Sequence, residues 1–94
     1  MQKTEILERM ASSEYTLIFV DELGSIRDVV CFDRTPTADD MLKFNTQHRN
    51  QICRCFAKTT LNETDLDRIV AEMAADFRWA KSHNLRPGTN IRKP

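Results

Sequence analysis

The fold of this chain is decided by the stretch Tyr15-Thr16-Leu17-Ile18-Phe19-Val20, which is rich in β-branched and aromatic residues. A second run of the same kind extends from Ile26 to Phe32. The residues between the two runs include Gly24, which suits a turn position with a positive φ angle. The sequence therefore predicts a β-hairpin over residues 15–33.

Neither face of the predicted hairpin is polar. Leu17 and Phe19 share one face of the first strand, and Ile18 and Val20 share the other. A two-stranded ribbon is not stable alone, so both faces must be covered or the sheet must gain strands. The sequence shows no clear third strand, and we therefore expect a homodimer in which strands pair across the interface.

Three helices are predicted around the hairpin. A short helix spans residues 2–12, a second spans residues 38–58, and a third spans residues 63–83. Thr37, with Asp40 three residues later, forms an N-cap pattern for the second helix. The predicted fold is α+β, in the order helix, hairpin, helix, helix. The last helix is expected to pack on the hairpin through an apolar stripe made of Leu66, Ile69, Val70, Met73 and Phe77.

The predicted second helix contains a run of polar residues from 45 to 51. Two explanations remain open at this point. The helix either crosses an exposed region or is interrupted there, or the polar run forms a recognition surface.

Length and composition indicate one domain and limit the possible locations. The chain has 94 residues, and we assign residues 1–85 to a single domain and residues 86–94 to a mobile basic tail. The longest apolar run, residues 17–20, is too short to span a bilayer, and no secretory segment is evident. An odd number of cysteines without a signal peptide favours reduced thiols in the cytoplasm.

The three cysteines are Cys31, Cys53 and Cys55, and none is predicted to be reactive. Cys31 lies within a predicted strand and is expected in the core. Cys53 and Cys55 are two residues apart, so within a helix they point about 200° away from each other and cannot share a metal ion. No metal site and no cofactor is predicted.

Catalytic signatures are also missing from the sequence. Asp39 and Asp40 are explained by their place at a helix start, and neither His48 nor His83 lies beside a serine, cysteine or aspartate in a known arrangement. With only Gly24 and Gly88, a glycine-rich phosphate loop is impossible. We therefore do not expect an enzyme.

Trp79 is the strongest functional indication in the sequence. On a helical wheel it points away from the apolar stripe of the last helix. It either packs inside the chain or contacts a partner, and tryptophan is enriched in interface hot spots. The residues predicted to bind a partner protein are Trp79, His48, Arg49, Gln51 and Arg54.

Nucleic-acid binding is the alternative function. The basic residues of the predicted middle helix and of the tail could contact phosphate, although the acidic start of the last helix would repel it. The residues assigned to this alternative are Arg49, Arg54, Lys58, Arg86, Arg92 and Lys93.

The small size, the helix-hairpin-helix-helix order, the reduced cysteines and the missing catalytic signature resemble the small accessory proteins of temperate phages. Antirepressors and host-enzyme inhibitors of this kind act by binding a repressor or an enzyme. The resemblance implies a regulatory module that binds another protein and occludes or disassembles its target.

Overall fold

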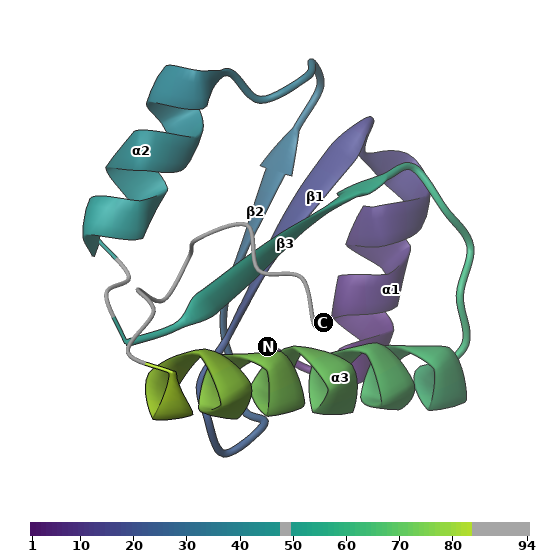
Figure 1. Cartoon of the computed structure of the whole chain (residues 1–94). Coiled ribbons are helices and arrows are strands. Elements are labelled where there is room, and N and C mark those ends of the chain that lie inside the picture. The colour runs from purple at the N-terminus through teal and green to yellow at the C-terminus, as the bar shows by residue number, and fades with distance from the viewer. Residues whose placement is uncertain (48–49, 84–94) are drawn as a thin grey trace.

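A computed structural model describes residues 1–47 and 50–83 of the chain. The order of elements is α1 (Lys3–Ser12), β1 (Tyr15–Val20), β2 (Ile26–Phe32), α2 (Ala38–Gln47), β3 (Ile52–Ala57) and α3 (Glu63–Ser82). Figure 1 shows the strands in one sheet with helices on both sides of it. The predicted α+β class is confirmed.

The sheet has three antiparallel strands in the order β2-β1-β3, so the first strand lies in the centre. Leu17 of β1 faces Val30 of β2 on one side and Cys55 of β3 on the other. The pairing of β1 with β2 shifts register between Phe19 and Val20, which marks a β-bulge or a similar irregularity. The predicted hairpin over residues 15–33 is therefore confirmed.

The prediction of one helix over residues 38–58 was wrong. The helix ends at Gln47, and residues 52–57 form β3, the third strand that the sequence did not reveal. The polar run thus interrupts the helix. Because Ile52 and Phe56 are apolar and fit both a helical and an alternating pattern, pairing with the buried β1 selects the strand. The hairpin is thus extended by a strand of the same chain, and the expected homodimer stays a prediction.

One face of the sheet is covered by α1 and α3, which pack against each other and against the strands. The hairpin contacts the last helix, as predicted, and the predicted apolar stripe of α3 is buried. An ion pair of 2.7 Å between Lys3 and Asp67 joins the two helices. The buried core on this side consists of Ile6, Met10, Ile18, Val20, Val29, Ile52, Leu66, Ile69, Val70, Met73, Ala74 and Phe77.

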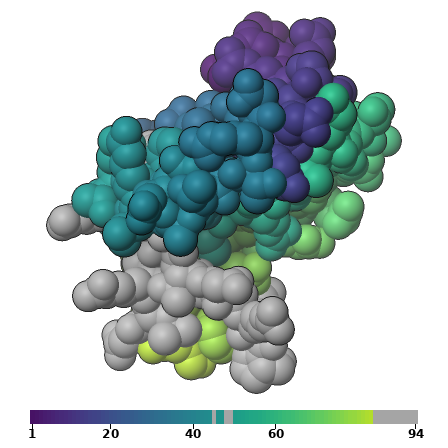
Figure 2. All heavy atoms as spheres, turned by 90° about the horizontal axis from the view of Figure 1, so that it is seen from above, coloured from purple at the N-terminus to yellow at the C-terminus, as the bar shows by residue number. Residues whose placement is uncertain are grey.

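The other face of the sheet receives α2. Phe44 of this helix lies 5.8 Å from the ring of Phe19 and 6.0 Å from the ring of Phe32, measured between ring centroids. In Figure 2 the purple atoms of α1 and the teal atoms of α2 lie apart, with the blue segment of the chain between them. Both apolar faces of the hairpin are thus covered by helices of the same chain. Cys31, which we expected in the core, is exposed at the outer strand β2.

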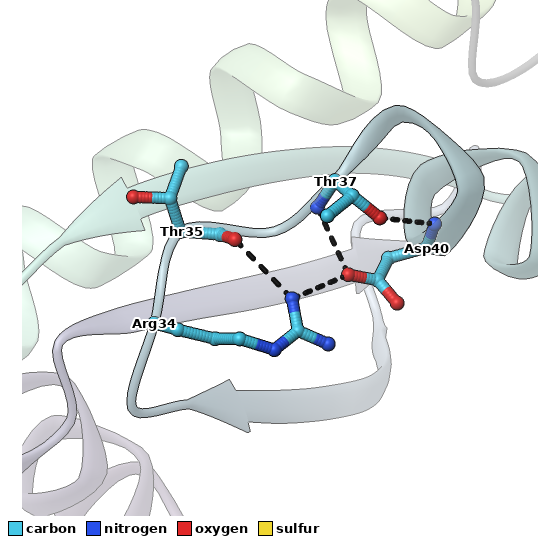
Figure 3. A network of polar contacts seen from close by, with 4 residues as sticks. All are labelled: Arg34, Thr35, Thr37 and Asp40. Carbon is cyan, nitrogen blue, oxygen red and sulfur yellow. Dashed lines mark hydrogen bonds and ion pairs between the residues drawn. The ribbon is translucent and has the colours of Figure 1, made fainter.

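The start of α2 is fixed by the predicted Thr37–Asp40 pattern (Figure 3). Asp40 N–H donates to Thr37 Oγ1 at 3.1 Å, and Thr37 N–H donates to Asp40 Oδ2 at 2.9 Å. The same carboxylate accepts from Arg34 at 2.7 Å, and Arg34 also donates to the carbonyl of Thr35. The hydrogen bond from Arg34 and the backbone bond from Thr37 hold the pKa of Asp40 well below its usual range.

The last helix begins with a second reciprocal cap. Asp65 N–H donates to the Asn62 side chain at 2.8 Å, and the Asp65 carboxylate accepts from Asn62 N–H. The predicted tail, residues 86–94, lies outside the described residues. Among the helices of residues 1–47 and 50–83, none is long and apolar enough to cross a membrane.

Candidate functional site

A groove lies between the β1–β2 turn and one flank of α3. We call it the turn–helix groove, and its volume is about 320 Å³. Its central residues are apolar, and a charged side chain lies towards each end of the helical lining. The residues that line the groove are Leu23, Gly24, Asp67, Val70, Ala71, Ala74 and Arg78. The arrangement has room for an apolar side chain from another molecule.

The turn that forms one wall is fixed by local hydrogen bonds. The Asp21 carboxylate accepts from Leu23 N–H at 3.0 Å and from Ser25 N–H at 2.9 Å, as expected of an aspartate that starts a turn. Gly24 has a φ of 86°, which confirms the predicted positive-φ position. A Cβ atom placed on it would lie 3.9 Å from Ala74, so the turn closely approaches the helix.

Two hydrogen bonds between residues far apart in the sequence connect the same turn to α3. Arg78 Nη1 donates to the backbone carbonyl of Glu22 at 2.7 Å, and Lys81 Nζ donates to the Glu22 carboxylate at 3.0 Å. The groove is therefore bounded by two segments whose spacing is set by hydrogen bonds rather than by apolar contact alone.

Leu23 stands at the rim of the groove with 87% of its surface exposed. Large apolar residues with this degree of exposure are rare in the described part of the chain, the others being Met1 at 62% and Leu42 at 66%. Since the backbone of the turn is held by Asp21 and Glu22, Leu23 is presented without a large ordering cost. This side chain and the groove beside it form the candidate site.

Trp79 of α3 is not among the residues that line the groove. It is half-buried, and its ring stacks on His83 with 4.2 Å between the ring centroids. His83 Nδ1 lies 2.8 Å from the Trp79 carbonyl oxygen, which fixes the imidazole at the helix end. Of the two alternatives for Trp79, these contacts favour packing within the chain.

Of the other residues predicted to bind a partner, the structure describes Gln51 and Arg54. His48 and Arg49 lie outside the described residues. Gln51 is half-buried, and its side-chain oxygen Oε1 is buried with no hydrogen-bond partner among residues 1–47 and 50–83. Arg54 of β3 reaches to α3, with Nη2 at 3.3 Å from Asp76 and Nη1 at 3.7 Å from Glu72.

The residues assigned to nucleic-acid binding either form ion pairs within the chain or lie outside the described residues. Arg54 is paired to α3 as above, and Lys58 forms an ion pair of 3.1 Å with Glu14. The remaining members of that set, Arg49, Arg86, Arg92 and Lys93, lie outside the described residues.

Cys53 and Cys55 belong to a strand, so they share one face of the sheet. Our argument that they point apart was therefore wrong. Burial raises the pKa of the Cys53 thiol to about 12, with a further contribution from Cys55, and burial also raises the pKa of Cys55. High pKa values oppose thiolate chemistry. Across residues 1–47 and 50–83, no group of three or more metal-ligating side chains gathers.

Sequence reasoning missed Leu23 and the groove. A signal was present, because Leu23 is a large apolar residue inside the polar turn of residues 21–25. The facing wall, formed by Ala71 and Ala74, could not be paired with this turn from spacing alone.

Comparisons with known proteins give no relative. The chain matches no protein-family model, no curated protein and no solved structure. The function therefore has to be inferred from the geometry of the chain.

Proposed function

We propose that this chain is a small regulatory module that binds another protein through Leu23 and the turn–helix groove. The observation that carries the proposal is the fixed presentation of Leu23, 87% exposed, beside an apolar-floored groove. An apolar anchor surrounded by hydrogen-bonded and charged groups is typical of protein interfaces. Arg78 lines the groove, and its guanidinium carries further N–H donors besides the one bound to the Glu22 carbonyl.

The partner we propose is a cytoplasmic repressor or host enzyme, whose action is occluded or whose assembly is disrupted by the bound module. The character of the chain resembles phage antirepressors and inhibitors, and this resemblance supports the choice of partner class. Catalysis by Cys53 or Cys55 has less support, because burial raises the pKa of both thiols.

The test compares matched surface leucines. Tagged wild-type chain, Leu23→Ser and Leu42→Ser are used to capture proteins from nuclease-treated extract, and retained proteins are identified by mass spectrometry. We expect one stoichiometric protein with the wild type and with Leu42→Ser, and at least a tenfold loss with Leu23→Ser. Equal capture by Leu23→Ser and the wild type would contradict the proposal.

The same assay distinguishes nucleic-acid binding. Phosphate-driven binding weakens steeply with salt, whereas an apolar protein interface weakens little. Retention of nucleic acid when nuclease is omitted, lost between low and moderate salt and unaffected by Leu23→Ser, would support the alternative instead.

A further inference from the structure

The outer strand β3 directs half of its backbone hydrogen-bonding groups away from the sheet. Lys58 N–H donates to the Glu14 carbonyl at 2.9 Å, so Glu14 faces β3. Residues of an antiparallel strand alternate between their two neighbours, and Thr16, Ile18 and Val20 therefore also face β3. Their partners Ile52, Arg54 and Phe56 point back to β1, which leaves the groups of Cys53, Cys55 and Ala57 at the open edge. No hydrogen bond from these three backbone groups to any described residue is present.

The β3 edge lacks the proline, lysine and β-bulge features by which proteins usually prevent a further strand from pairing. It has no proline, glycine or lysine between Ile52 and Ala57, and its pairing with β1 shows no register shift. Its single charge, Arg54, is drawn towards Glu72 and Asp76 of α3. The side chains of Cys53, Cys55 and Ala57 share one face of the sheet and are small, so they leave room on that face for the side chains of a neighbouring strand.

The opposite edge of the sheet is different. Strand β2 has a register shift beside Val20, and its Val29 N–H is bound by the Asp28 carboxylate at 2.8 Å. By the same alternation Val29 is one of the residues whose backbone groups point outwards. The Asp28 side chain thus accepts the hydrogen bond of the Val29 N–H, which would otherwise pair with an added strand.

We propose that β3 pairs with β3 of a second copy of this chain, antiparallel and about a two-fold axis at Cys55. A second copy is the occupant that the edge itself favours, because β3 carries a single charge, Arg54, which a reversed copy can set opposite an uncharged residue. Pairing doubles the three-stranded sheet and places hydrogen-bonding groups of Cys53 opposite the partner's Ala57. Each such facing pair exchanges two hydrogen bonds.

The charge of Arg54 selects this register. A two-fold axis at Arg54 sets this residue opposite the partner's Arg54, and like charges directly opposite each other are destabilising. An axis at Cys55 instead sets Arg54 opposite the partner's Phe56, where a guanidinium and a ring attract each other. The overlap of the strands is the same length in both cases, so the side-chain pairs decide.

The test uses two exposed cysteines, one at each edge. Proline at position 55 or 31 removes an outward amide and leaves the pairing with β1 intact. Full-length reduced protein is measured by size-exclusion chromatography with light scattering. We expect the mass of two protomers for the wild type, Cys31→Pro and Cys55→Ser, and of one protomer for Cys55→Pro.

Ala57→Pro provides a second edge variant in case Cys55→Pro unfolds, and circular dichroism checks the fold of each. A wild type that has the mass of one protomer at every concentration overturns the proposal, as does a two-protomer mass for a folded Cys55→Pro or Ala57→Pro. Loss of the dimer in Cys31→Pro also overturns it. Leu23→Ser is expected to remain dimeric, so this inference and the proposed function can fail separately.

Discussion

Cys31 in β2 and Cys55 in β3 are both exposed cysteines with outward-facing backbone groups, yet the two edges that contain them differ. The β2 edge has a register shift and an amide bound by Asp28, whereas the β3 edge has neither. Since a cysteine stands at both edges, these residues do not account for the difference. The protection of a sheet edge depends instead on backbone geometry and on neighbouring polar groups. We infer that, of the two edges of the described sheet, β3 is the one open to a second strand.

Truncating a buried side chain of β1, the central strand that pairs with both edge strands, should lower the free energy of unfolding most. Ile18 of β1 is 0% exposed and lies in the main core. Ile18→Ala is expected to lower the free energy of unfolding by about 2–5 kcal/mol, measured by urea denaturation. Leu42→Ala, at a position that is 66% exposed, is the control and should change it by less than about 0.5 kcal/mol. Similar losses in both variants would show that β1 is not the centre of the core.

Opening the protected edge tests the comparison directly. Asp28→Ala frees Val29 N–H, and we expect a loss of about 1 kcal/mol in unfolding free energy. Species heavier than the wild-type dimer should also appear in light scattering, because a second edge has lost its block. Asp33→Ala, at an exposed position after β2, is the control. An unchanged mass for folded Asp28→Ala would mean that Asp28 does not protect the edge.

The ion pairs between Arg54 and α3 should contribute less to the free energy of unfolding than the buried core or the Asp28 hydrogen bond does. Arg54→Ala is expected to lower the free energy of unfolding by about 0.5–1 kcal/mol at low salt, and by less at high salt. Arg68→Ala removes an exposed pair with Glu72 on α3 alone and should have the smaller effect. An equal effect of the two substitutions would indicate that Arg54 does not anchor β3 to the helix.

The reactivity of the cysteines distinguishes the edges without disturbing the fold. With iodoacetamide at about pH 8, Cys31 should be alkylated first, Cys55 more slowly and Cys53 last, since burial raises the pKa of the latter two thiols. Peptide mass spectrometry follows each site. In Ala57→Pro, Cys55 should react faster while Cys31 is unchanged, and equal rates at Cys55 in dimer and monomer would count against pairing at β3.

The raised pKa of Cys53 also predicts a pH dependence of stability. Its thiol stays protonated in the folded chain up to about pH 12, whereas an unfolded cysteine loses its proton near about pH 8.5. The unfolded state is therefore favoured as pH rises above about 8.5, and stability falls. Cys53→Ser should show a weaker fall in urea titrations across this range.

Elements with strong local signals could be predicted from the sequence. The hairpin followed from Tyr15–Val20 and from Gly24, and α2 begins at the predicted Thr37–Asp40 pattern. β3 could not be predicted, because the apolar residues of 52–57 fit a helix as well as a strand until β1 is available to pair with them.

The candidate site was harder to predict than the fold. Leu23 could be recognised as an unusual residue of a turn, but the groove exists only because that turn packs beside Ala71 and Ala74. From the sequence, Arg54 was predicted to bind a partner protein. In the structure it forms ion pairs with Glu72 and Asp76, which lie on a helix far along the chain. Such contacts depend on the tertiary arrangement, which spacing along one element does not show.

Hydrogen exchange of the β3 amides tests the central claim most directly, because it observes the open edge itself. In wild-type protein, we expect the amides of Cys53, Cys55 and Ala57 to exchange slowly at high concentration and faster on dilution, while the amides of Ile52, Arg54 and Phe56 stay slow throughout. Fast exchange of Cys53, Cys55 and Ala57 at every concentration would contradict the pairing of β3 with a second copy.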